Sequence, residues 1–271
     1  MRPTTLVSVF TLVLFAAAPA RAGDPDFDRD GVPNVEDNCP ETVLTTEFAD
    51  FSVVAGLSLV GTARQGRVII GLVSAPRSAG AAWLNAPIAL TPDLGFTSMF
   101  TVAMPGEASS GEGMTFTLQA RGPRELGGRF GGLGYEGISD SVAVEIDTRF
   151  GGADDPPYDH VAILRDGNVD RHLAVAPTPF DPTLVPQWTC WVEYDGRTDL
   201  LSVYLSADGE HPLEPLMTYV VDLTTLGDVV WAGFTSAASN TNPVSTQLLS
   251  WTLEVRDPDQ TDVDSDGLGA P

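Results

Sequence analysis

The sequence contains no lysine, only three histidines and only two cysteines. All 14 of its basic residues are arginines, and 37 acidic residues outnumber them to give a net charge of −23. Such a charge repels nucleic acid and anionic membranes, and it attracts divalent cations. The composition therefore excludes nucleic acid as a partner and favours a protein that binds metal ions.

The scarcity of cysteine and histidine also narrows the possible chemistry. Cys39 and Cys190 cannot form a disulfide framework, and Cys190 lies in the strand-like run QWTCWVEYDG, where a buried apolar thiol is expected. Three histidines leave few ways to build the zinc site of a metal hydrolase, and no G-x-S-x-G nucleophile motif is present.

Long hydrophobic runs are also rare. The apolar run 6–18 is too short to span a bilayer, and it follows Arg2 and precedes Ala-Arg-Ala at 20–22. This order is typical of a secretory signal peptide, here 1–22, and it fits better than a membrane anchor because of the cleavage pattern. We expect a secreted or cell-surface protein without a later transmembrane segment. Abundant Gly, Ala and Pro with arginine as the sole long-chain cation indicate a bacterial origin.

The middle of the chain has almost no helical periodicity. Apolar residues are 43% of the chain, which is enough for a sizeable core. Asp195-Gly196 is expected to form a hairpin turn. Short alternating runs, separated by Gly, Pro, Asp and Asn, occupy 96–104, 113–120, 141–147, 200–206 and 248–255. Many short strands with turn signals predict an all-β antiparallel sandwich.

Two carboxylates stand on one of these predicted strands, in VAVEIDTRFGGADDPPYDH (142–160). Successive strand residues point to opposite faces, so Glu145 and Asp147 share one face, about 6.8 Å apart. Asp155 and His160 follow in the next loop and strand. The residues alone leave three interpretations open: a catalytic acid pair, a metal site or a solvated face.

The enzymatic interpretation lacks a second catalytic group. Glycosidases of the laminarinase type, which share a sandwich fold, place a second glutamate shortly after such a pair, and retaining hydrolysis needs both carboxyls. Here Thr148, Arg149 and Phe150 occupy those positions. Because arginine cannot donate and recover a proton at neutral pH, we expect no enzymatic activity.

Both ends of the chain contain alternating aspartates. In DFDRDGVPNVED, aspartates fall at positions one, three, five and twelve, and Gly31 falls at position six, as in a calcium-binding loop. A solvated acidic linker is the alternative. The predicted calcium ligands are Asp26, Asp28, Asp30, Val32 through its carbonyl, Asn34 and Asp37, and, in a second loop, Asp262, Asp264 and Asp266.

The pattern DxDxDGxxNxxDNCP resembles the thrombospondin type 3 repeat, and DPDQTDVDSDGLG resembles the part of that repeat after its Cys-Pro pair. The resemblance implies calcium loops at 23–45 and, in shortened form, at 257–271. We hypothesise that the β domain between them is inserted into a repeat array. An inserted domain needs its two ends close in space.

The segment 47–255 resembles the legume-type (L-type) lectin domain. The similar pieces, in family order, are FADFSVVAGLSLVGTA, GEGMTFTLQA, GGLGYEGISDSVAVEIDT, DPPYDH and WAGFTSAASNTNPVSTQLLSWTLEV. The resemblance implies a concanavalin-like antiparallel β-sandwich (jelly roll) over 46–256. It also implies a calcium-dependent carbohydrate-binding protein whose partners are glycans.

The resemblance implies two metal ions side by side. A transition ion, manganese or another, would be held by Glu145, Asp147, Asp155 and His160. Calcium would take Asp147, Asp155 and the carbonyl of Arg149. Carboxylate and carbonyl oxygens suit calcium, and an added imidazole suits a transition metal.

The sugar site implied by the resemblance is altered in this chain. Glu112 replaces the family's sugar-binding aspartate, and Gly151 or Gly152 stands where an asparagine is expected. Gly131 and Gly132 would offer backbone N–H groups, and Tyr135 and Phe150 would stack on sugar. The function expected is glycan recognition or adhesion. The alternative is a structural or adhesive surface domain that keeps the fold without a working sugar site.

Overall fold

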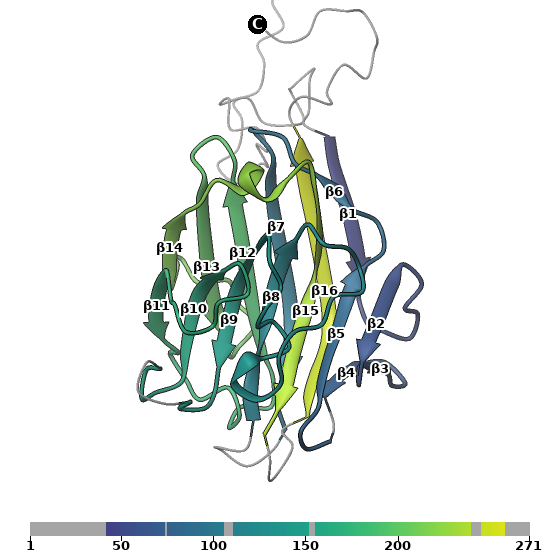
Figure 1. Ribbon diagram of the computed structural model, residues 1–271, viewed down its shortest axis with the longest axis vertical. Helices are drawn as coiled ribbons and strands as arrows, with labels where there is room; N and C mark the ends of the chain where they lie inside the picture. The colour runs from purple at the N-terminus through teal and green to yellow at the C-terminus, as the bar shows by residue number, and fades with distance from the viewer. Residues whose placement is uncertain (1–41, 74, 106–110, 152–154, 240–244, 258–271) are drawn as a thin grey trace, which may run out of the picture. The chain divides into compact units, whose positions relative to one another are not determined.

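The computed structural model describes residues 42–73, 75–105, 111–151, 155–239 and 245–257, and they form a sandwich of two antiparallel β-sheets (Figure 1). The first sheet has the order β14 (Met217–Val220), β13 (Leu200–Ser206), β12 (Trp188–Asp195), β7 (Gly95–Ala103), β16 (Thr246–Asp257), β4 (Ile70–Val73) and β3 (Arg64–Gln65), and β1 (Thr42–Phe48) also pairs with β16. The predicted fold class is therefore confirmed.

The second sheet contains the strands that the sequence associates with function. Its order is β11 (Ala174–Pro177), β10 (His160–Arg165), β9 (Ser141–Asp147), β8 (Gly111–Gln119), β15 (Val229–Ala238), β5 (Ala79–Leu84) and β2 (Leu57–Gly61), and β6 (Ile88–Ala89) pairs with β15. The short 3-10 helices η1 (Phe130–Gly132) and η2 (Leu223–Leu226) are the only helical segments within the described ranges. None of the helices described is long and apolar enough to cross a membrane.

The alternating runs of the sequence all form strands, namely β7, β8, β9, β13 and β16. The predicted turn joins β12 to β13, where the N–H of Thr198 donates to the carbonyl of Asp195 at 3.3 Å. The inward side chains fill the space between the sheets. Phe100, for example, packs edge-on to Phe234 with ring centroids 4.9 Å apart. Cys190 is buried in this core, as predicted, and burial raises the pKa of its thiol.

A layer of loops covers the outer face of the second sheet. Strand β9 is buried along its whole length, because Val142, Val144 and Ile146 face the main core while Ala143 faces a second, smaller cluster. Loop residues of that cluster come from 121–140 and 166–173. The carboxylates of β9 therefore lie under loops and not in solvent.

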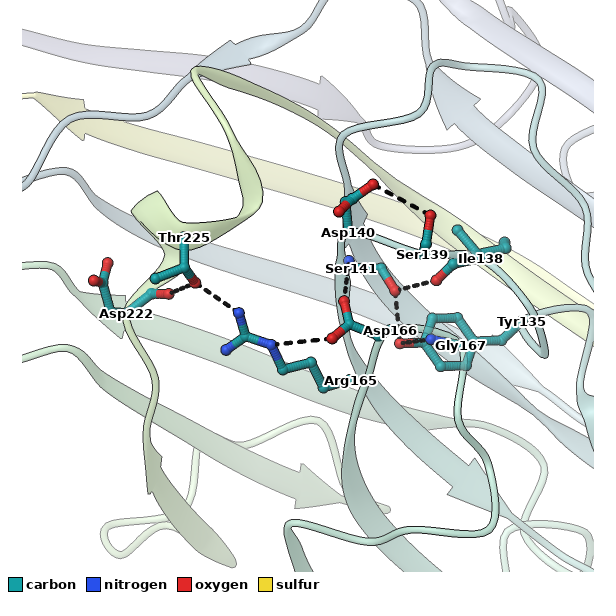
Figure 2. A network of polar contacts seen from close by, with 10 residues as sticks. All are labelled: Tyr135, Ile138, Ser139, Asp140, Ser141, Arg165, Asp166, Gly167, Asp222 and Thr225. Atoms are coloured by element: carbon teal, nitrogen blue, oxygen red, sulfur yellow. Dashed lines mark hydrogen bonds and ion pairs between the residues drawn. The ribbon is translucent and has the colours of Figure 1, made fainter.

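Tyr135 attaches this loop layer to the sheet (Figure 2). The Ser141 hydroxyl donates to the carbonyl of Ile138 at 2.6 Å, so the hydroxyl of Tyr135, 2.8 Å away, donates to Ser141. The N–H of Gly167 donates to the same tyrosine oxygen at 3.1 Å. Burial raises the pKa of Tyr135 to about 12, which keeps this donor neutral. The expectation that Tyr135 stacks on sugar is wrong, because its ring is fully buried.

The two ends of the sandwich lie side by side. In the pairing of β1 with β16, Thr42 is opposite Asp257. Strand β1 begins at Thr42, four residues before the boundary at 46 that the sequence predicts. Cys39 and all the predicted ligands of the terminal calcium loops lie outside the described residues.

Candidate metal centre and ligand-binding site

Strand pairing brings the predicted metal ligands together. Asp147 on β9 is directly opposite His160 on β10, and Glu145 lies two residues earlier on the same face of β9. Glu145 is 2% and Asp147 7% exposed. A solvated face, one of the three interpretations of the sequence, is therefore wrong, because the loop layer covers both carboxylates.

His160 presents one ring nitrogen to these carboxylates. Its Nε2 lies 3.8 Å from Oε2 of Glu145 and 3.6 Å from Oδ1 of Asp155. Its Nδ1 lies 3.1 Å from the carbonyl of Tyr158, which can only accept, so Nδ1 carries the proton in the neutral ring. Nε2 is then an unprotonated electron-pair donor, and a backbone carbonyl that orients a histidine in this way is common in metal sites.

Two buried atoms at this centre lack a hydrogen-bond partner within the described part of the chain. They are Oε2 of Glu145 and Nε2 of His160. Buried polar atoms are normally paired, because leaving them unpaired costs about 1–3 kcal/mol each. Both atoms are acceptors, so a cation, a proton or a donor such as a water molecule between them would stabilise the arrangement.

The local electrostatics also favour a cation. Burial, and then the charge of Glu145, raise the pKa of Asp147 to about 9. The N–H of Arg149 donates to Oδ1 of Asp147 at 2.6 Å, which offsets a part of this cost. A divalent ion in contact with the carboxylates would keep them ionised.

The predicted ligand set fits a metal ion. Donor atoms of Asp147, Asp155 and His160 all lie within 4.8 Å of one another. Asp155 is in addition oriented by the backbone N–H of Gly151, which donates to its Oδ2. These residues, with Glu145, would hold the transition ion, and Asp147 and Asp155 would supply oxygen ligands to calcium.

His172 is a member of the centre that the sequence does not reveal. Its Nε2 lies 3.4 Å from Oε2 of Glu145, and donor atoms of Glu145, His160 and His172 lie within 4.8 Å of one another. The contact with Glu145 raises the pKa of His172. His172 lies in the loop between β10 and β11, at a spacing from His160 that matches no ligand motif, so no local signal could have identified it.

A cavity connects the metal centre to the glycine loop. Gly131, Gly132 and Gly151, three of the predicted sugar contacts, line it together with Asp147 and Asp155. The remaining lining residues are Glu136, Glu145, Val169, Asp170 and His172. A Cβ added to Gly131 would meet no atom within 4 Å, so this glycine borders open space.

Glu112, the fourth predicted sugar contact, points to a different partner. Its carboxylate accepts a hydrogen bond from Nη1 of Arg149 at 2.7 Å, and the residue is only 6% exposed. Burial raises the pKa of Glu112, and the Arg149 charge opposes that rise. The carboxylate is thus engaged within the protein and does not line the cavity.

A second hollow lies next to the metal loop. Phe150 and Tyr158 are 57% and 48% exposed beside it, and Arg149 contributes a charge. The other residues that line it are Thr148, Pro157, Asp159, Asp181 and Thr183. Aromatic faces surrounded by hydroxyl and charged groups are typical of sites that bind sugars.

Known structures share this fold. The chain is similar to the Bauhinia forficata lectin in complex with GalNAc, with 23% identity and a TM-score of 0.67 over 79% of this chain and 98% of that one. It is also similar to the metal-free form of Griffonia simplicifolia lectin I-B4, with 21% identity and a TM-score of 0.68 over 78% of this chain and 99% of that one.

Sequence relatives and a family assignment agree with these structures. The chain is 28% identical over 220 residues (74% of it) to the L-type lectin-domain containing receptor kinase VIII.1 of Arabidopsis thaliana, and 30% identical over 165 residues (57% of it) to the lectin alpha chain of Lablab purpureus. These alignments span 30% and 56% of the two relatives' lengths. Residues 45–268 match the legume lectin domain. The chain therefore belongs to the legume lectin domain family, a family of carbohydrate-binding proteins.

Proposed function

We propose that this protein is a secreted, calcium-dependent lectin that recognises glycans or mediates adhesion through them. One observation carries the proposal. Gly131, Gly132 and Gly151 border the same cavity as the buried carboxylates Asp147 and Asp155. A metal ion on those carboxylates would hold the loop that contains Gly151 against the glycine loop.

The chain's own groups suit a sugar better than a charged or purely apolar ligand. Glycines let a ligand approach the backbone closely, and backbone N–H groups can donate to sugar hydroxyls. Glu136 and Asp170, which also line the cavity, can accept hydrogen bonds from hydroxyl groups. The exposed rings of Phe150 and Tyr158 in the neighbouring hollow can stack on a further sugar unit.

We propose that the sugar binds differently from the way the family resemblance implies. Because Arg149 engages Glu112, the carboxylate expected to anchor the sugar is not free. We propose that Glu136 or Asp170 provides the anchoring carboxylate. The relatives' ligands, GalNAc for the Bauhinia forficata lectin and a methyl glycoside of α-L-fucose for Ulex europaeus lectin I, are suitable first probes.

A glycan array tests the proposal. The protein is loaded with calcium and manganese, its metal content is measured by mass spectrometry, and binding is compared with and without chelator. We expect binding that disappears with chelator. If the metal-loaded protein binds no glycan, the lectin proposal fails, and a structural or adhesive domain with the lectin fold remains.

A variant locates the site. Gly131→Val would add a side chain to the cavity, and its Cβ would meet no protein atom within 4 Å, so it should abolish glycan binding while the protein stays folded. Gly71→Val is the matched control, because Gly71 on β4 also has open space around an added Cβ and lies in the other sheet. Equal glycan binding by both variants would place the sugar elsewhere.

The remaining alternative, glycosidase activity, can be tested directly. Turnover of a β-glucan that disappears on Glu145→Gln would establish it. We expect no turnover, because Glu145 lies among histidines and Asp147 and because Arg149 and Phe150 stand where the second catalytic carboxyl is required.

A further inference from the structure

Two imidazoles converge on one buried carboxylate at this centre. Nε2 of His160 and Nε2 of His172 lie 3.8 Å and 3.4 Å from the same atom, Oε2 of Glu145. The two rings meet edge to face, with centroids 5.1 Å apart. They come from different elements, since His160 begins β10 and His172 lies in the loop after it.

The burial of these groups requires something between them. Oε2 of Glu145 and Nε2 of His160 have no hydrogen-bond partner in the described ranges, and both side chains are almost fully buried. The His172 side chain is 12% exposed. At 3.4 Å its contact with Glu145 is long for a hydrogen bond. A protonated His172 would neutralise Glu145, but it would leave Nε2 of His160 without a partner.

The spacing matches that of ligands around one ion. Ligand atoms bound at about 2.0–2.2 Å to a tetrahedral zinc-type ion lie about 3.3–3.6 Å apart. The contacts of 3.4 Å and 3.8 Å to Glu145, and of 3.6 Å between His160 and Asp155, require only small movements to reach this spacing. His172 can thus coordinate directly with no change in the fold.

We propose that His172 is a direct metal ligand and that, with Glu145 and His160, it makes the transition-ion position selective for zinc-type ions over manganese. Two imidazoles favour ions late in the Irving–Williams series, whereas manganese prefers sites richer in oxygen. Asp147 and Asp155 remain available as oxygen ligands for calcium. This inference deepens the proposed function, because it rests on the same metal centre.

Competition between metals tests the selectivity. Metal-free protein is titrated with zinc and with manganese, each with calcium present. We expect zinc to bind at least about a hundredfold more tightly than manganese. His172→Asn should weaken zinc about ten- to hundredfold and change manganese affinity little. The matched control is His211→Asn, since His211 is exposed beside Glu193 in the first sheet and should not affect either metal.

A second measurement needs no variant. X-ray absorption of the zinc-loaded protein counts the imidazoles bound to the ion, and we expect two. One imidazole, or zinc affinity unchanged by His172→Asn, would overturn the proposal and leave His172 as an ion-pair partner of Glu145. Absence of any bound transition ion in the unmodified protein would overturn the metal centre as well. If glycan binding is lost in chelator but the protein binds manganese more tightly than zinc, only this inference is overturned, and the proposed function stands.

Discussion

Asp147 ends strand β9, and the charges of Glu145 and Asp155 both act on its carboxylate. Its raised pKa, about 9, expresses the cost of an ionised group in this place without a cation. The same environment makes the residue a strong metal ligand, because an ion would relieve that cost. Asp147 would therefore couple the stability of the fold to metal and to pH.

Replacement of Asp147 should change the free energy of unfolding in opposite directions with and without bound metal. In chelator, Asp147 stays protonated in the folded protein up to a pH of about 9, whereas the unfolded chain loses this proton above the ordinary pKa of 3.8. Between these two values the unfolded chain binds fewer protons than the folded protein. The contribution of Asp147 to the free energy of unfolding therefore falls as pH rises toward about 9. We expect Asp147→Asn to raise the free energy of unfolding in chelator at pH near 8, with a smaller gain near pH 5.

Urea unfolding measures this difference. With metal ions present, the same substitution should instead lower stability, since a ligand is lost. Asp93→Asn, at an exposed position, is the control and should change neither value by more than about 0.5 kcal/mol. A destabilised Asp147→Asn protein in chelator at high pH would contradict the account of this carboxylate.

At the scale of strands, the contact between β8 and β9 depends on Gly113. This residue has φ +139°, and a Cβ there would lie 2.2 Å from the carbonyl of Ile146. The close approach places β8 against Asp147, its partner in the register. A side chain at this position would push the two strands apart at the metal centre.

Gly113→Ala should therefore lower the free energy of unfolding by about 2–4 kcal/mol, from backbone strain and overpacking together. Gly71→Ala is the matched strand control. An added Cβ there meets nothing within 4 Å, so a loss below about 1 kcal/mol is expected. Equal losses in thermal or urea unfolding would show that the close contact does not matter.

The loop layer depends on Tyr135, which holds it to β9 and to Gly167 (Figure 2). Tyr135→Phe leaves the ring in place and removes one hydroxyl. The buried Ser141 hydroxyl and Gly167 N–H then each lose a partner, so we expect a loss of about 1–3 kcal/mol in urea unfolding. The glycine loop with Gly131 and Gly132 should also become more open to hydrogen exchange.

Tyr219→Phe is the control for this substitution. Tyr219 is half-buried on the edge strand β14, and no hydrogen bond of its hydroxyl is found within the described ranges. It should lose less than about 0.5 kcal/mol. If the two variants unfold alike, the hydroxyl of Tyr135 is not what anchors the loops.

For the whole molecule, the effect of bound metal ions would depend on the net charge. A chain with a net charge of −23 repels itself, and its cluster of buried carboxylates adds to that repulsion. Bound divalent cations would reduce both effects. An ion that binds only the folded state also stabilises it by mass action.

Removal of metal should therefore lower the melting temperature. At ion concentrations about a hundredfold above Kd the stabilisation is about 2.7 kcal/mol, which corresponds to about 5–10 °C for a domain of this size. Thermal unfolding with and without chelator measures the shift, and sodium chloride at matched ionic strength controls for screening. The shift should be smaller for Asp155→Asn. No shift in the unmodified protein would contradict the metal centre.

The two ends of the sandwich lie as the insertion hypothesis requires. Thr42 and Asp257 face each other across β1 and β16, as an inserted domain requires. The terminal calcium loops lie outside the described residues, so the insertion itself stays a prediction.

The sequence by itself determined the strands and four members of the metal centre. The alternation of apolar and polar residues along a strand is a local property of the sequence. It therefore predicts that Val144 and Glu145 lie on opposite faces of the strand and that Glu145 and Asp147 lie on the same face. Asp155 and His160 lie close to this strand in the chain, and the family resemblance named them as ligands. The structure brings all four together.

Only the tertiary structure decided which distant side chains complete the site. His172 and the partnership of Arg149 with Glu112 depend on how loops cross the sheet, and Tyr135 is buried because its loop packs on β9. Such contacts join residues that no periodicity relates. Their geometry is set by packing of the whole loop layer, and the free energy of that packing is not encoded in any short stretch of sequence.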